Sequence, residues 1–329
     1  MVPTLSTPSM HYWRMAPDPR LRPHVLCYFL ARPTPGASTS AAVARSSAPR
    51  EEELLLPDGH SEIVFQLDGA FERWQLGEAA QRHVMRRSYV IGSRSHSVLT
   101  RDLGPVTVAG IKLDPRALRE LLGTPLSELR DSTVTLAELG QRRLIGLESA
   151  VASAVSARAP SGSDPSARDP SAVDVAAVLD RFLLQALGAL PPASAAVEQL
   201  LRQIRASRGA LAIMEWAHER RVDARHLERR FAEAMGMTPK RYARIIRFKH
   251  GYHALLSQPG LSRAAEPTLS RPSFALAHRH LDGFYDQSHF NREFRAFIGA
   301  APSARLKATL PQATSISDHL LAGELSSEV

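Results

Sequence analysis

The stretch GFYDQSHFNREFRAFIGAAP, residues 283–302, decides the fold of the C-terminal part of the chain. Phe290 and Phe294 are four residues apart, and Phe297 follows one turn later, so the three rings share one side of a helix. Asp286 is a helix-capping residue, and Gly283 suits the turn before it. We therefore expect a capped amphipathic helix with its aromatic side buried.

The opposite side of this helix carries polar residues close to its start: Gln287, Ser288, Asn291 and Arg292. Amide side chains can pair with adenine N6 and N7, and arginine can pair with guanine O6 and N7. These residue types, placed at the start of a helix, are suited to base edges in a major groove. We predict that these four residues contact DNA.

Residues 211–236 repeat the pattern. A short apolar helix ends in the polar turn HERRVD, Asp223 can cap a second helix, and Leu227 and Phe231 form its buried side. A short helix, a tight turn and a second helix make up a helix-turn-helix unit. The outward residues near the start of the second helix are Arg225, Glu228 and Arg229, for which we predict contacts to guanine or cytosine.

Both units continue alike. In AMGMTPKRYAR (234–244) and FIGAAPSARLK (297–307), a glycine is followed by two residues and a proline. The chain therefore contains an internal repeat of two helix-turn-helix units. Residues 239–256 between them have helical periodicity and would form a connector about 27 Å long, at about 1.5 Å per residue.

On these motifs, residues 196–307 resemble the DNA-binding domain of the AraC-type (AraC/XylS) transcriptional regulators. The signature of the second unit reads GFYDQSHFNREFRAFIGAAPSAR in this chain. The resemblance implies a sequence-specific regulator, activator or repressor, whose two recognition helices enter successive major grooves. It implies no catalytic residue, no cofactor and no metal. We also expect Arg241, Arg244 and Arg295 to contact phosphates.

The sequence departs from the family pattern in three places. Arg221 stands where the first turn usually has a glycine, which requires either a positive φ at a non-glycine residue or a different turn. Residues 257–272 form a longer connection than usual into the second unit. Leu276 and Ala277 lie farther from Gly283 than the pattern predicts, so the second unit could sit at an altered angle.

The charge of the chain is concentrated in the same region. The formal net charge is +8, and residues 196–307 carry 20 Lys and Arg against 10 Asp and Glu, a net of +10. The rest of the chain has 41 − 20 = 21 against 33 − 10 = 23, a net of −2. A basic segment of this kind favours double-stranded DNA as the partner, because it attracts phosphates and releases counterions. A basic solvated face without a partner is the alternative.

The N-terminal half has a different pattern. Residues 61–69, 87–95 and 105–115 are β-branched or aromatic runs that predict strands, and 115–123 and 135–155 predict helices. The fold class is α+β, a β-rich sensor-like domain followed by an all-α double helix-turn-helix domain. We predict a β-rich domain over 1–156 with a flexible insertion at 33–50, a linker at 157–174, a connecting helix at 175–192, the DNA-binding domain at 193–307 and a flexible tail at 308–329.

The β-rich half resembles the N-terminal sensor domain of an AraC-type subgroup. The resemblance implies three further partners that the sequence leaves open: a small-molecule effector, a second copy of the chain and RNA polymerase. It implies no membrane partner. His60, Glu62, His83 and His96 are better explained as strand-edge or turn residues than as metal ligands. Cys27 has no partner cysteine and is expected to be buried. No run of apolar residues is long enough to cross a bilayer, and we expect a cytoplasmic, nucleoid-associated protein.

Two alternatives remain at this stage. The first is a metal-dependent cupin-like enzyme with a helical appendage, which needs clustered histidine and carboxylate ligands. The second is a helical protein-interaction module without affinity for DNA, which would bind duplex weakly and without dependence on salt.

Overall fold

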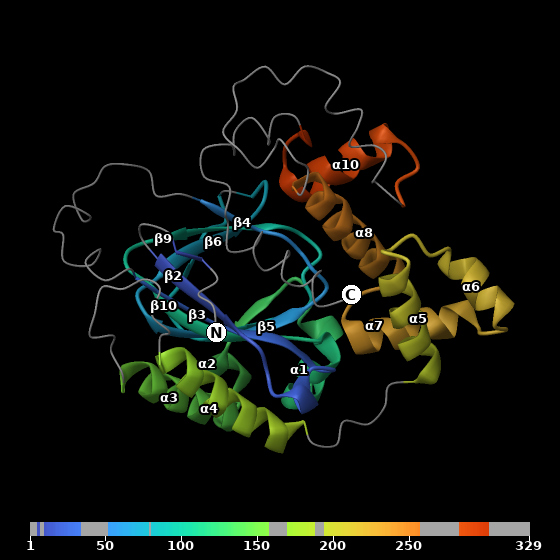
Figure 1. The fold of residues 1–329 in the computed structure, drawn as a ribbon. Helices are drawn as coiled ribbons and strands as arrows, with labels where there is room; N and C mark the ends of the chain where they lie inside the picture. The colour runs from blue at the N-terminus through green and yellow to red at the C-terminus, as the bar shows by residue number, and fades with distance from the viewer. Residues whose placement is uncertain are drawn as a thin grey trace.

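The computed structural model describes residues 5–6, 10–33, 52–78, 80–157, 170–187, 194–256 and 283–302. A β-rich half, residues 5–187, is followed by a helical half, residues 194–302, as the sequence predicted (Figure 1). The two halves have separate main cores, and a few side chains of the β-rich half join the core of the helical half.

The β-rich half contains two antiparallel sheets. The larger has the order β1 (Leu5–Ser6), β2 (Met10–Met15), β3 (Val25–Pro33), β10 (Thr107–Leu113), β5 (Ser61–Asp68), β8 (Tyr89–Ile91) and β11 (Thr133–Thr135). The smaller has the order β4 (Glu53–Leu55), β9 (Val98–Asp102), β6 (Phe71–Gln75) and β7 (His83–Met85). The predicted strands at 61–69, 87–95 and 105–115 contain β5, β8 and β10.

Strand β5 shows how the sequence assigns the two faces of the large sheet. Ile63 and Phe65 are fully buried in the main core of this half. Glu62 and Val64, which alternate with them, line a pocket instead. Because successive side chains of a strand point to opposite faces, the large sheet has one face on a helical layer and the other on the pocket.

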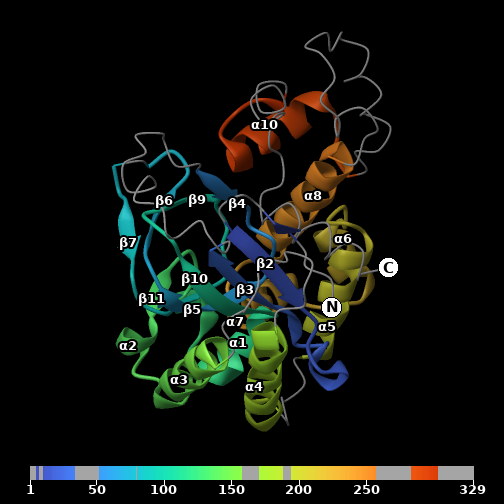
Figure 2. The same ribbon diagram turned by 60° about the vertical axis from the view of Figure 1, so that its left-hand side comes forward.

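The helical layer consists of α1 (Pro115–Leu122), α3 (Arg142–Ser156) and α4 (Pro170–Ala186). The short elements of this half are η1 (Pro19–Leu21), η2 (Leu126–Glu128) and α2 (Leu136–Leu139). Both views place α3 and α4 on the side of the large sheet away from α10 (Figures 1 and 2). Helix α1 begins with Pro115 and ends at Gly123, which has φ 65°, as the sequence predicted.

Two expectations for this half were wrong in detail. The single helix expected at 135–155 is two helices, because Gly140 adopts φ 62° and ends α2. Residues 170–174, expected to be linker, are helical and belong to α4, which also contains the first part of the connecting helix expected at 175–192. Leu179 and Leu183 of α4 are fully buried in the same core as α3, so apolar packing holds this helix on the β-rich half.

The helical half comprises α5 (Ala195–Ala206), α6 (Ile213–Glu219), α7 (Ala224–Met235), α8 (Pro239–Leu256) and α10 (Gln287–Ile298). Trp216, Phe231 and Phe294 share its core, as their helical spacing predicted. The connector expected at 239–256 is α8. The expectations for residues 34–51, 158–169, 257–282 and 303–329, including Leu276, Ala277 and the C-terminal tail, lie outside the described residues.

Packing of α4 can be tested with Leu179→Ala. Removal of this fully buried side chain leaves a cavity, and we expect the free energy of unfolding to fall by about 2–5 kcal/mol. Val173→Ala on the same helix is the matched control, because Val173 is 54% exposed and its truncation should cost less than about 0.5 kcal/mol. Urea titration followed by circular dichroism measures both. Equal stability of the two variants would contradict the packing of α4.

Candidate nucleic-acid interface and internal pocket

Helices α6 and α7 form the first helix-turn-helix unit. The Asp223 carboxylate accepts a hydrogen bond from the backbone N–H of His226 at 2.6 Å and so caps α7. Arg221 adopts φ 53° in the turn, so the arginine takes the left-handed conformation that a glycine would adopt more easily. The Val222 N–H donates to the Ala217 carbonyl at 3.0 Å and closes the turn.

The predicted reading residues of this unit lie on the solvent side of α7. Leu227 and Phe231 are buried, and Arg225, Glu228 and Arg229 are exposed. The Arg229 guanidinium donates to Glu233 at 3.2 Å, one turn later on the same helix. The start of α7 therefore presents two arginines and one glutamate to solvent.

Helix α10 is built in the same way. The Asp286 carboxylate caps it by accepting from the His289 N–H at 2.6 Å, and Phe290, Phe294 and Phe297 are buried. Gln287, Ser288 and Arg292 are exposed. Asn291 differs from the prediction, because it is only half exposed and its Oδ1 is buried without a hydrogen-bond partner among the described residues.

The three arginines predicted to contact phosphates differ in their surroundings. Arg241 is exposed and donates to Ser95 Oγ of the β-rich half at 3.3 Å. Arg244 is paired with Glu293 of α10, and its guanidinium lies 4.9 Å from the centre of the Phe297 ring. Arg295 is exposed on α10. A contact to phosphate from Arg241 or Arg244 would therefore compete with an existing interaction.

The two halves are joined by a cluster of charged residues around Asp114, a connection that sequence reasoning missed. Asp114 is 5% exposed, caps α1 and accepts from Arg116 Nε at 2.7 Å. It also accepts from Arg205 Nη2 of α5 at 3.2 Å, and Arg205 Nε donates to the Tyr242 hydroxyl of α8 at 2.9 Å. Arg116 in turn pairs with Glu198 of α5.

Burial alone would raise the pKa of Asp114, but hydrogen bonds and charge from Arg116, with the charge of Arg205, lower the pKa to about 2. The carboxylate thus stays ionised in the interface. The dipeptide Asp114–Pro115 is a visible signal for the helix cap. Nothing local in the sequence marks the contact of Asp114 with the helical half, because its partner Arg205 is 91 residues away.

Both helix-turn-helix units contact the β-rich half. Ser93 Oγ donates to the Met235 carbonyl at the end of α7 at 2.7 Å. Leu76, which follows β6, packs against Gly299 at the end of α10, where a Cβ would lie 3.1 Å from Leu76 Cδ2. The ends of α7 and α10 are thus held by the β-rich half, and the starts of both helices remain exposed.

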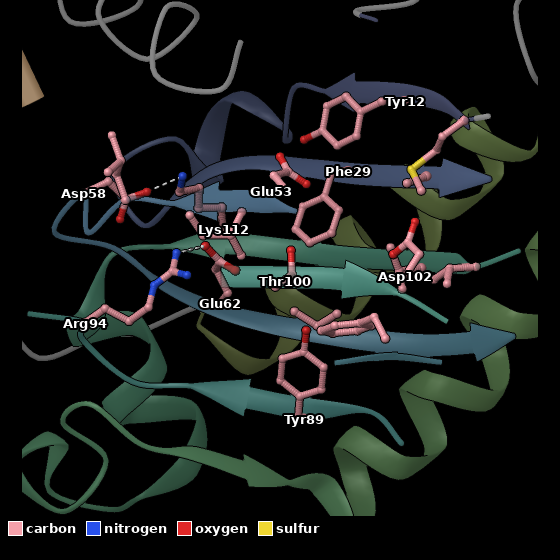
Figure 3. A pocket seen from close by; sticks show the side chains of 18 residues that line it. Tyr12, Phe29, Glu53, Asp58, Glu62, Tyr89, Arg94, Thr100, Asp102 and Lys112 are labelled. Atoms are coloured by element: carbon pink, nitrogen blue, oxygen red, sulfur yellow. Dashed lines mark hydrogen bonds and ion pairs between the residues drawn. The ribbon is translucent and has the colours of Figure 1, made fainter. Parts of the chain in front are cut away.

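Between the two sheets lies a cavity of about 150 Å³. Its walls are mainly apolar and aromatic, with Tyr12, Phe29, Phe71 and Tyr89 among them. Figure 3 shows a charged end, where Asp58 pairs with Lys112 and Arg94 Nη2 donates to Glu62 at 2.9 Å. Burial raises the pKa of the Tyr12 and Tyr89 phenols, so both hydroxyls are neutral at ordinary pH.

The candidate metal residues do not form a site in the described part of the chain. Glu62 is paired with Arg94, and His60 is buried beside Asp58, whose carboxylate accepts from the His60 N–H at 3.0 Å. Within the described ranges, no group of three or more His, Cys, Asp or Glu residues could hold a metal ion. Cys27 is buried, as expected. No helix in these ranges is long and apolar enough to cross a membrane.

One part of the chain matches a known protein family. Residues 13–135 match a family model described as a domain of unknown function (DUF6597). No curated protein matches the sequence.

Solved structures of ToxT from Vibrio cholerae are similar to the chain at a distance. One from strain O395 is 12% identical, covers 80% of this chain and 95% of its own, and has a TM-score of 0.40. Another, a crystal form at 1.65 Å resolution, is 11% identical, covers 79% and 94%, and has a TM-score of 0.41. A third, with an unsaturated fatty acid bound, is 11% identical, covers 81% and 94%, and has a TM-score of 0.38. Similarity at this level carries no functional argument.

The Asp114 cluster makes a prediction about pH. Because the pKa of Asp114 is lowered from 3.8 to about 2, its stabilising effect is present above about pH 4 and is lost as the pH falls through about 2. Asp114→Asn should lower the free energy of unfolding by roughly 2 kcal/mol at pH 7, and the gap to the natural protein should close between pH 4 and 2. Urea unfolding at each pH measures this gap.

Asp68→Asn, at an exposed carboxylate of the same half, is the control and should show a much smaller effect. A gap for Asp114→Asn that stays constant down to pH 2 would contradict the account of this carboxylate.

Proposed function

We propose that the chain is a sequence-specific DNA-binding transcriptional regulator of the AraC type, in which α7 and α10 read neighbouring major grooves. The observation that carries this proposal is the repeated arrangement of these two helices. Each is capped by an aspartate, each buries an apolar side with residues four apart (Leu227 and Phe231 on α7, Phe290 and Phe294 on α10), and each exposes arginine and other polar side chains at its start. Helix N-termini and arginines are the groups that contact phosphates and guanine edges.

The connector between the two units supports the same function. Helix α8 has 18 residues, which corresponds to about 27 Å. Successive major-groove faces on one side of a duplex are about 34 Å apart. Units placed near the two ends of such a helix have a separation suited to one turn of DNA.

The residues proposed to read bases are Arg225, Glu228 and Arg229 on α7, and Gln287, Ser288, Asn291 and Arg292 on α10. Asn291 needs a change of rotamer to reach a base, because it is half buried. Arg241, Arg244 and Arg295 are the proposed phosphate contacts. Arg241 would have to leave Ser95, and Arg244 would have to leave Glu293, to reach a phosphate. For Arg295, no side-chain interaction described above would have to be broken. RNA polymerase and a second copy of the chain are further proposed partners. The proposed location is the cytoplasm.

The cavity of the β-rich half supports a small-molecule effector. Its walls are largely apolar, and two ion pairs, Asp58 with Lys112 and Glu62 with Arg94, lie at one end. Pockets with apolar walls and a few convergent polar groups are the usual form of small-molecule sites. We therefore propose an amphipathic effector and a regulatory rather than a catalytic role for this half.

The first test is the dependence of DNA binding on salt. If several arginines contact phosphates, the affinity for duplex DNA should fall by about tenfold or more between 50 and 200 mM NaCl. Fluorescence anisotropy with a labelled duplex measures this slope. Weak binding that does not depend on salt would instead support a helical protein-interaction module.

The second test concerns base reading. On a duplex enriched by selection from a random pool, Arg229→Ala and Arg292→Ala should each cost about 1–3 kcal/mol and relax the preference at particular base pairs. Arg142→Ala, an exposed arginine on α3 of the β-rich half, is the control and should leave binding unchanged. An equal loss on all sequences would make Arg229 and Arg292 phosphate contacts rather than base contacts.

A further inference from the structure

Helix α8 runs from α7 to α10 in both views, and the turn between α5 and α6, residues 207–212, is fixed on its middle (Figures 1 and 2). The Gly209 carbonyl accepts two hydrogen bonds from the Arg247 guanidinium, from Nε at 3.1 Å and from Nη2 at 2.7 Å. Gly209 has φ 78°, and a Cβ on it would lie 2.2 Å from the Ala243 carbonyl oxygen. Glycine is required here, because it allows the turn to lie directly on the backbone of α8.

The turn before α10 rests on the same arginine. Gly283 has φ 95°, and a Cβ on it would lie 3.4 Å from Arg247 Cγ and 3.5 Å from Cδ. The Cβ of Ala210, beside Gly209, lies 3.2 Å from the same point. One side chain thus reaches both helix-turn-helix units. Its guanidinium holds the turn that leads into α6, and its aliphatic stem lies against the turn that leads into α10.

Aromatic packing also joins α8 to both units. On the side of the first unit, the ring centres of Tyr242 and Phe231 are 5.8 Å apart, and on the side of the second, Phe248 stacks on Phe297 at 4.4 Å. Burial of apolar surface is non-directional, whereas a guanidinium is planar and donates in a fixed geometry. Arg247 therefore adds a directional contact to this packing, and its half-buried position limits competition from water.

Arg247 differs in this respect from the other described arginines of α8. Arg241 donates to Ser95 of the β-rich half, and Arg244 is paired with Glu293 of α10. In the contacts that the described residues make, Arg247 is the arginine of α8 that reaches both helix-turn-helix units.

From these contacts we propose that Arg247 is a positioning residue, which sets the angle and the distance between α7 and α10. It acts through the turns at Gly209 and Gly283 and touches neither base nor phosphate. This proposal rests on the proposed function for its meaning, because the placement of the two helices matters for DNA only if both enter one duplex.

The placement of the two units can be measured without DNA. Cys27 is the only cysteine and is buried, so nitroxides can be attached selectively to Arg230→Cys on α7 and Ala296→Cys on α10, both at exposed positions. In double electron–electron resonance on the full chain, we expect Arg247→Met to broaden the distance distribution about twofold, because methionine keeps an apolar stem but cannot donate hydrogen bonds. Arg202→Met, at an exposed arginine of α5, is the control and should leave the distribution unchanged.

The preference for half-site spacing gives a second readout. The duplexes carry two selected half-sites about 10 base pairs apart, the same half-sites moved by one base pair, or one half-site alone. We expect this change of spacing to cost the natural protein about tenfold in affinity and Arg247→Met about twofold or less. The affinity for one half-site should be the same for both proteins. Arg295→Met, which removes a proposed phosphate contact, should instead weaken binding to every duplex alike.

An unchanged distance distribution for Arg247→Met, or equal broadening for Arg202→Met, would overturn the proposal. An equal loss of affinity on one and on two half-sites would do so as well, because Arg247 would then be a phosphate contact. If Arg247→Met does not fold, Arg247→Lys, which keeps the charge without the planar fork, is judged by the same criteria. A broadened distribution in a protein without salt-dependent DNA binding would contradict the proposed function and leave the role of Arg247 intact.

Discussion

The buried carboxylate of Asp114 is the interaction on which the arrangement of the two halves depends. It caps α1, holds Arg116 and accepts from Arg205, which in turn donates to Tyr242. A buried carboxylate is costly unless positive charge and hydrogen bonds surround it, and removal of one partner leaves the others uncompensated. The cluster therefore favours one docking geometry, since only this geometry brings α1, α5 and α8 together around the same charge.

This geometry leaves the proposed reading surface accessible. The β-rich half holds the ends of α7 and α10 through Met235 and Gly299, while the starts of both helices stay exposed. Docking thus constrains where the two helices lie without covering the side chains proposed to read bases. For a reader of two successive grooves, the relative placement of the helices matters as much as their contacts, because both must fit one duplex.

Local signals allowed much of the helical half to be predicted. The caps Asp223 and Asp286, the phenylalanine spacing and the connector at 239–256 all follow from interactions within a few residues. The position of α4 and the Asp114 cluster could not be predicted, since they depend on pairs of residues far apart in the chain. The exposure of Asn291 could not be predicted either. Helical spacing places this residue at the edge of the exposed side, and packing decides how far its side chain turns inward.

In the proposed function, α7 and α10 both enter the major groove of one duplex. Protection of guanine N7 from dimethyl sulfate on a selected duplex tests this most directly, because N7 lies in the major groove. We expect two protected clusters whose centres are about 10 base pairs apart, on one face of the DNA. A single protected cluster, or a bound duplex without protection at guanine N7, would contradict it.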